Sequence, residues 1–187
     1  FLTLLLTICS VAAQEVDLDS KMQSYGLVDV QSLDKTIGVE LKYSSEDNFV
    51  GEDMYGDLER AYLTPAVAHS VALAQRLLRE RYPEYTLLIY DAARPLSVQK
   101  RMRKAVEGTP LTAYVADGAR GGRHNYGVAV DLTIIDNNGQ ILDMGAPFAH
   151  FGRESWIGTD KNTTLASYKA YVEWQRKEGI ISDEAAR

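Results

Sequence analysis

Two residues in the stretch RHNYGVAVDLT, at 123–133, have types and a spacing suited to metal chemistry. They are His124 and Asp131, seven positions apart, with Gly127 between them. An imidazole and a carboxylate are ligands that zinc uses in sites that keep one coordination position open. The same pair could also be hydrogen-bonded without any metal, and the spacing alone does not separate the two interpretations.

The metal interpretation depends on the elements that hold these side chains. The run at 128–134 is rich in β-branched residues and predicts a strand. Asp131 is then expected on a rigid sheet, with His124 on the loop just before it, where Gly127 allows a tight turn. Side chains alternate along a strand, so two faces are expected. These are Ala129, Asp131 and Thr133 on one face, and Val128, Val130 and Leu132 on the other.

A guanidinium is the third group that could do chemistry. The apolar run TLLIY at 86–90 predicts a buried strand that delivers Asp91 and Arg94 at its carboxyl end. Pro95 restricts Arg94 to an extended backbone. Two interpretations are open: a structural ion pair between Arg94 and Asp91, or a guanidinium aimed into a cleft at an anion or a polarised carbonyl.

Length and composition suit one globular domain with a sizeable core, since the chain has 187 residues and is 45% hydrophobic. A net charge of −6 without a Lys/Arg cluster argues against nucleic-acid binding. The single cysteine, Cys9, excludes an internal disulfide and a zinc-finger type of site. The oligomeric state cannot be inferred. The remaining patterns predict strands at 27–30 and 36–43, helices at 64–82, 97–106 and 163–178, and a hairpin turn at 136–139.

The first residues, FLTLLLTICSVAA at 1–13, have the pattern of a partial secretory signal peptide. The segment is apolar and ends in small residues of the A-x-A-like kind, and it is too short for a transmembrane helix. We therefore expect an exported, periplasmic protein with a mature domain at 14–187. An alternative is a lipoprotein box that ends at Cys9 and gives a lipid-anchored protein.

Several segments together resemble the zinc D-alanyl-D-alanine dipeptidases, the type associated with vancomycin resistance and with peptidoglycan dipeptide recycling. The matching segments are LKYSSEDNFVG (41–51), AYLTP (61–65), DAARPLSVQ (91–99), HNYGVAVDLT (124–133), LDMG (142–145) and PFAHFG (147–152). The resemblance implies a single α+β domain, with a central, mostly antiparallel sheet flanked by helices. It also implies one Zn²⁺ per chain and a small D-amino-acid dipeptide or a peptidoglycan peptide as substrate.

The resemblance gives roles to five residues. His124 and Asp131 match the family's first two zinc ligands, and Arg94 matches its transition-state-stabilising arginine. Tyr43 falls where the family has an active-site tyrosine near the substrate, and Asp91 precedes the arginine as in the family, so both are expected to be substrate-binding residues. In such enzymes a zinc-activated water attacks the peptide carbonyl and a Glu is the general base.

The sequence departs from the family pattern at several points. The E-W-W-H motif that carries the family's general-base Glu and third ligand His is missing, because no His follows Glu173-Trp174. We therefore expect that the domain lacks its C-terminal part, that the natural product is longer, and that the chain as given is inactive. Three further substitutions are Gly122 for a serine, Ala149 for an aspartate that pairs with the substrate's free amine, and Trp156 for a His found in some members.

These departures leave three functions open. The first is a zinc dipeptidase that hydrolyses D-Ala-D-Ala in peptidoglycan metabolism. The second is a related D,D- or L,D-peptidase that cuts longer stem peptides, which the loss of an amine-pairing aspartate at Ala149 would permit. The third is a non-catalytic wall-binding module derived from this fold, which the changes at Gly122 and Ala149 also motivate.

Overall fold

The computed structural model describes residues 17–152 together with Ser155, Glu173 and Lys177. Strands in this part of the chain form two small sheets, one two-stranded and antiparallel (β1-β3), the other three-stranded in the order β2-β4-β5. In the larger sheet β4 lies between a parallel neighbour, β2, and an antiparallel neighbour, β5. The strands are β1 (Val28–Asp29), β2 (Gly38–Val39), β3 (Tyr62–Leu63), β4 (Thr86–Asp91) and β5 (Asp131–Ile135).

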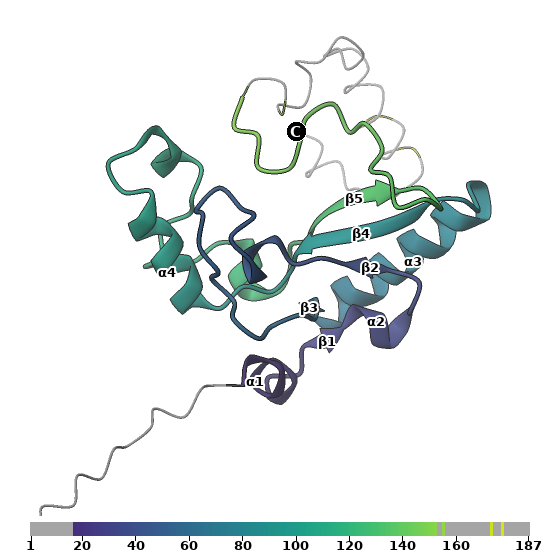
Figure 1. The fold of residues 1–187 in the computed structure, drawn as a ribbon. Helices are drawn as coiled ribbons and strands as arrows, with labels where there is room; N and C mark the ends of the chain where they lie inside the picture. Colours follow the sequence, from purple (N-terminus) through teal and green to yellow (C-terminus); the bar gives the residue numbers. More distant parts are fainter. Residues whose placement is uncertain (1–16, 153–154, 156–172, 174–176, 178–187) are drawn as a thin grey trace, which may run out of the picture.

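Helices pack around these sheets and complete a single α+β domain, as predicted (Figure 1). The α-helices are α1 (Leu18–Ser24), α2 (Val30–Leu33), α3 (Pro65–Arg81) and α4 (Leu96–Ala105), and the 3-10 turns are η1 (Lys42–Ser44), η2 (Pro110–Ala113) and η3 (Arg123–Tyr126). Among the described residues no helix is both long and apolar enough to cross a bilayer. The predicted signal peptide, Cys9, Trp156 and most of the predicted helix at 163–178 lie outside the described residues.

The longest helix, α3, begins with Pro65 in the first turn, where the missing N–H costs nothing. A buried amide joins it to the strands. Gln75 is fully buried; its Oε1 accepts a 2.9 Å bond from the Leu87 N–H, and its Nε2 donates a 3.0 Å bond to Thr36 Oγ1. This link fixes α3 against the start of β4, which in turn places the other end of β4 at the candidate site.

The two predicted N-terminal strands are shorter than expected. After Asp29 the chain enters α2, because the Asp29 carboxylate caps that helix by accepting the Gln31 N–H at 3.0 Å. The run at 36–43 keeps only β2 as a strand and then turns into η1. The Tyr43 carbonyl accepts bonds from the N–H groups of Met54 and Tyr55, at 2.8 and 3.0 Å, instead of joining a ladder.

The predicted strand at 128–134 begins only at Asp131. Before it the backbone is held by the neighbouring loops: Thr64 N–H donates to the Gly127 carbonyl, and Val128 N–H donates to that of Arg123. Val128 lies before the strand and is 46% exposed, whereas Val130 and Leu132, which were expected on the same face, pack against the core. The hairpin prediction at 136–139 is supported by an isolated bridge between Ile135 and Ile141.

Candidate active site

The candidate site lies where β4 ends and β5 begins. Asp91, the last residue of β4, pairs with Asp131, the first residue of β5, next to a register irregularity in the ladder. The chain leaves β4 through Ala92 and Ala93 to Arg94 before α4 starts. Antiparallel pairing therefore brings Asp131 beside a segment forty positions earlier in the sequence, which carries the guanidinium.

Three hydrogen bonds tie the His124 turn to the end of β4. His124 Nδ1 lies 2.8 Å from the Ala92 carbonyl oxygen. In return, the Arg94 N–H donates to the His124 carbonyl at 3.0 Å, and Asn125 Nδ2 donates to the Arg94 carbonyl at 2.8 Å. The turn η3 ends at Gly127, whose φ of 64° is the left-handed conformation that favours glycine.

The imidazole is oriented as a metal ligand should be. Because a carbonyl only accepts hydrogen bonds, the contact with Ala92 assigns the proton to Nδ1 and leaves a lone pair on Nε2. His124 Nε2 lies 3.6 Å from Asp131 Oδ1. Two ligands about 2.0–2.1 Å from a tetrahedral zinc are separated by roughly 3.4 Å, so the pair fits one ion. A backbone acceptor on the second ring nitrogen is the usual outer partner of a metal-bound histidine.

Asp91 completes a cluster in which ligand atoms of Asp91, His124 and Asp131 all lie within 4.8 Å of one another. Its oxygens, however, are already engaged. Oδ1 accepts from the Tyr55 hydroxyl at 2.6 Å and from the Ala92 N–H at 3.0 Å, while Oδ2 pairs with Arg94. Asp91 Oδ2 lies 3.4 Å from His124 Nδ1, whereas the nitrogen that faces Asp131 is Nε2. Asp91 therefore fits a supporting position beneath the ligands better than a ligand position.

Arg94 is held on several sides and is 9% exposed. Besides Asp91, Gln99 Oε1 accepts from its Nη1 at 2.8 Å, and Gln99 is in turn anchored by donating to the Ala116 carbonyl at 3.0 Å. The guanidinium carbon lies 5.0 Å from the centre of the Tyr43 ring. Burial disfavours the charge, but Asp91 outweighs it and raises the pKa of Arg94 above its ordinary value. Arg94 Nε is buried with no hydrogen-bond partner among the described residues, which leaves one donor unused.

The surroundings also raise the pKa values of Tyr43 and His124. Burial raises the pKa of the Tyr43 phenol well above its ordinary range, so Tyr43 is a neutral hydrogen-bond donor at neutral pH. For His124, burial opposes protonation, but the carboxylates of Asp131 and Asp91 outweigh it and raise the pKa above the ordinary 6.5.

A cleft of about 880 Å³ opens over these groups. Tyr43, Arg94, His124 and Asp131 all line it, as do the substituted positions Gly122 and Ala149 and the loop residue His150. Asp91, expected to be a substrate-binding residue, is completely buried and does not line the cleft. At Gly122 a Cβ atom would lie 3.2 Å from the Ala116 Cβ, so this wall has little space for the family's serine.

The sequence patterns did not predict the positions of two residues in this site, Tyr55 and Gln99. Tyr55 comes from a glycine-containing loop and reaches Asp91 across 36 positions. Gln99 lies in the segment DAARPLSVQ, but its contact with Arg94 follows only from the first turn of α4. No pattern in either segment distinguishes them from ordinary loop and helix residues.

The chain is similar to known proteins over the segments that form the cleft. Residues 23–163 match the peptidase M15 family described as D-ala-D-ala dipeptidase. The chain is also 37% identical over 126 residues to the D-alanyl-D-alanine dipeptidase of Escherichia coli (strain K12). That alignment covers 65% of this chain and 60% of the relative, so the chain spans about three-fifths of the relative's length. Because the family match covers most of the chain and includes the cleft residues, the protein belongs to the D-Ala-D-Ala dipeptidase family.

Proposed function

We propose that this protein is a zinc peptidase that hydrolyses D-Ala-D-Ala in peptidoglycan metabolism. The observation that carries the proposal is the convergence of His124 Nε2 and Asp131 Oδ1, 3.6 Å apart, in the cleft that Arg94 also lines. Similarity to the D-alanyl-D-alanine dipeptidase of Escherichia coli supports the substrate. The donor set of one neutral imidazole and one carboxylate supports zinc.

Each residue has a distinct task in this proposal. His124 and Asp131 hold the ion, whose chemistry when bound is to activate a water near neutral pH and to polarise the peptide carbonyl. Arg94 presents its guanidinium to the carbonyl oxygen, where negative charge develops as the bond is attacked. Asp91, Tyr55 and Gln99 keep that guanidinium in place. Tyr43, as a neutral phenol over the guanidinium, closes the wall of the cleft and can donate a hydrogen bond to the substrate.

Two protein donors hold zinc less tightly than three, and a peptidase of this kind needs a general base. We propose that a third histidine ligand and a glutamate base come from residues outside those described here, as the family resemblance implies. We also propose export to the periplasm, directed by the apolar segment at 1–13, with lipid attachment at Cys9 as the alternative.

The proposal is tested on the protein at its full natural length. We expect one zinc per chain and hydrolysis of free D-Ala-D-Ala to two alanines. His124→Ala should lose both, since the imidazole is a ligand. His69→Ala is the matched control, because His69 lies on the exposed side of α3 and should leave zinc content and turnover unchanged. Zinc bound at full occupancy without any hydrolysis would contradict the peptidase and favour a binding module.

A further inference from the structure

A pocket of about 620 Å³ lies beside the His124 turn and has no task in the proposed reaction. Its walls come from α1, from the segment at 93–97 and from the His124 turn, and we call it the turn pocket. Arg94 lines both this pocket and the catalytic cleft. Successive residues of the turn divide between the two spaces, since His124 lines the cleft and residues 125–127 line the turn pocket.

The lining of the turn pocket is mostly apolar. Met22 and Leu27 form part of its wall and are buried or half-buried. Tyr25, Leu96 and Tyr126 also line it and are exposed, so apolar surface is open to solvent here. A pocket of this volume, with apolar walls and a few polar groups, is typical of a site for a small molecule. Exposed apolar surface around such a pocket also indicates a binding site.

The charged groups of the turn pocket are all cations. Lys21 and Arg94 line it, and no carboxylate does so. Arg94 is paired with Asp91, whereas the Lys21 ammonium group has no ion pair with any described residue. One free cation in an apolar pocket favours an apolar molecule that carries a single negative charge.

The two carboxylates next to Lys21 in α1 do not neutralise it, because each has another partner. Asp17 caps the helix by accepting the Ser20 N–H at 3.2 Å. Asp19 Oδ1 lies 4.0 Å from Arg60 Nη1. Neither carboxylate lines the turn pocket, so Lys21 is available to an anion there.

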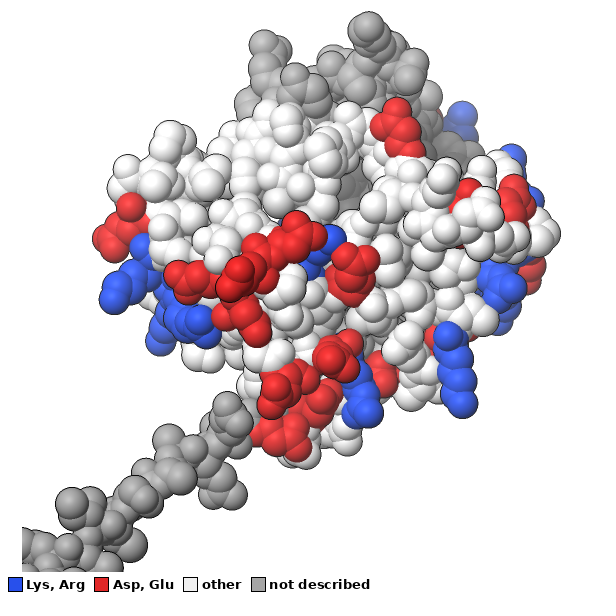
Figure 2. Space-filling model, in the orientation of Figure 1, with Lys and Arg blue, Asp and Glu red and all other residues white. Residues whose placement is uncertain are grey.

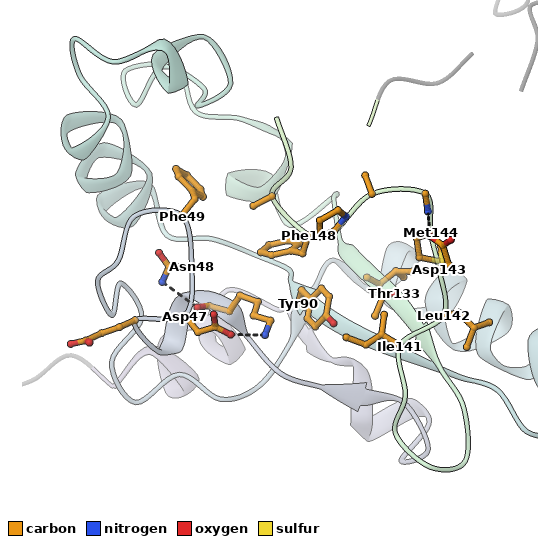
Figure 3. A pocket seen from close by; sticks show the side chains of 17 residues that line it. Asp47, Asn48, Phe49, Tyr90, Thr133, Ile141, Leu142, Asp143, Met144 and Phe148 are labelled. Carbon is orange, nitrogen blue, oxygen red and sulfur yellow. Dashed lines mark hydrogen bonds and ion pairs between the residues drawn. The ribbon is translucent and has the colours of Figure 1, made fainter. Parts of the chain in front are cut away.

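This charge contrasts with the rest of the molecule, whose net charge is −6. Figure 2 shows acidic side chains gathered on the face where the chain runs from β2 to β3. The cavity of about 700 Å³ beside Phe148, drawn in Figure 3, is lined by Glu46, Asp47 and Asp143. Its one cation, Lys42, is held by Asp47 at 3.0 Å. That cavity therefore disfavours an anion, whereas the turn pocket favours one.

The turn pocket also shares its walls with the hydrogen bonds that hold the candidate zinc site. Asn125 Nδ2 donates to the Arg94 carbonyl at 2.8 Å, and the Thr64 N–H donates to the Gly127 carbonyl at 2.9 Å. All four residues line the pocket. A molecule that fills it packs against the turn in the conformation that orients the His124 imidazole for zinc. Binding to one conformation in preference to others favours that conformation.

We propose that the turn pocket binds a small apolar carboxylic acid and that its occupancy strengthens zinc binding. The apolar chain lies between α1 and the start of α4, and the carboxylate pairs with Lys21. Coupling between two sites is reciprocal, so zinc strengthens binding of the acid by the same factor. The coupling rests on the proposed function, whereas the site itself does not, and no bond is made or broken in it.

The experiment compares octanoate with its uncharged matched analogue, octanamide, by isothermal titration calorimetry on the zinc-loaded protein at its full natural length. We expect octanoate to have a Kd about two- to fivefold below that of octanamide, the range for an exposed ion pair, and the difference to shrink at high salt. Lys21→Gln should remove the difference. Lys35→Gln, an exposed lysine outside the pocket, is the control and should keep it. Equal affinities in the parent protein would overturn the assignment of the carboxylate to Lys21.

A second pair of variants tests the place of binding. Leu96→Glu puts a negative charge on the pocket wall and should weaken octanoate binding by roughly fivefold or more, the effect of replacing an attraction by a repulsion. Leu77→Glu makes the same change at an exposed leucine of α3 outside the pocket and should leave binding unchanged. Both leucines are exposed, so both variants should fold. An equal effect of the two variants would overturn the site.

Titration of zinc with and without saturating octanoate tests the coupling. We expect the zinc affinity to rise by about fivefold, the low end for two coupled sites. Leu96→Glu should lose this effect, which separates the pocket from direct contact between octanoate and zinc. An unchanged zinc affinity with octanoate bound would overturn the coupling.

Two further outcomes separate the site from the other interpretations of this face. Sedimentation of the protein with phosphatidylcholine vesicles, without octanoate binding, would overturn the site in favour of a membrane-facing surface. Octanoate binding in a protein that does not hydrolyse D-Ala-D-Ala would support the site and refute the proposed function.

Discussion

The Tyr55 hydroxyl donates a 2.6 Å hydrogen bond to Asp91 Oδ1, and neither residue lines the cleft. Asp91 is completely buried and Tyr55 is 3% exposed. The other carboxylate oxygen of Asp91 pairs with Arg94. Tyr55 therefore helps to hold the guanidinium through Asp91, although it does not line the cleft.

Tyr55→Phe should keep the ring packing and remove this hydrogen bond. We expect the free energy of unfolding to fall by about 1–3 kcal/mol, the penalty for leaving a buried polar group unsatisfied. The value of kcat should fall more than KM changes, because in the proposed mechanism Arg94 acts on the charge that develops at the carbonyl oxygen. Tyr25→Phe, at a 75% exposed position, is the control for stability in thermal or urea unfolding. A Tyr55→Phe protein with unchanged stability and kcat would show that Asp91 does not need the bond.

Arg94→Lys should keep a positive charge near Asp91 but lose the fork of donors that binds Asp91 and Gln99 together. We expect kcat to fall by about 10²–10³-fold, the usual effect of removing a transition-state donor, with a folded protein and unchanged zinc content. Arg101→Lys, on the exposed side of α4, is the control. Equal loss of zinc and activity in Arg94→Lys would indicate a structural role instead.

Zinc affinity should depend on pH through His124. The metal needs the neutral imidazole, and the nearby carboxylates raise the pKa of His124 above 6.5, so protons compete at a higher pH than for an ordinary histidine. As the pH falls from 8, affinity should therefore start to decrease above pH 6.5. Titration with a zinc indicator at several pH values measures this.

The metal-free protein should show the opposite dependence. A raised pKa means that the folded state binds the proton more tightly than the unfolded state, whose His124 titrates near 6.5. This contribution to stability is complete below about pH 6.5 and is lost as the pH rises through the folded-state pKa. Unfolding of the zinc-free protein between pH 6 and 8 measures it, and Asp131→Asn should reduce it. A pH-independent stability in both proteins would contradict the assigned role of Asp131.

Gly127→Ala should disturb the His124 turn. The substitution places a Cβ in a left-handed backbone, 3.0 Å from Leu27 Cδ2 and 3.4 Å from the Thr64 nitrogen. Left-handed strain alone costs about 1–2 kcal/mol. Gly139→Ala is the matched control, since Gly139 also has a positive φ but has no atom within 4 Å of an added Cβ. We expect Gly127→Ala to destabilise the protein more than Gly139→Ala does, and to weaken zinc binding, which Gly139→Ala should not.

Sequence patterns predicted the elements that carry strong local signals. The helix after Thr64, the buried strand at 86–90 and the placement of Arg94 at its end follow from proline positions and apolar runs, and α3 and β4 lie there. The His124–Asp131 pair was also predicted, and the structure brings its two side chains together. Each of these features is specified by residues that are close together in the sequence, so local patterns are enough to predict it.

What the sequence did not predict depends on contacts between distant segments. The strand expected at 36–43 keeps only β2 and ends in η1, where the N–H groups of Met54 and Tyr55 bond to the Tyr43 carbonyl, a contact that no local pattern encodes. The same is true of the Tyr55–Asp91 bond, of Gln99 under Arg94, and of the cavity behind Phe148. Periodicity describes one element at a time, so it cannot specify which side chain of one loop meets the end of a strand far away.

The mutual hydrogen bonds between the His124 turn and the end of β4 have an evolutionary consequence. They join His124 and Arg94 into one hydrogen-bonded frame, and none of these three bonds involves the segment at 144–149, which also lines the cleft. Substitutions at 144–149 can therefore change the shape of the cleft while the hydrogen bonds that position His124 and Arg94 stay the same.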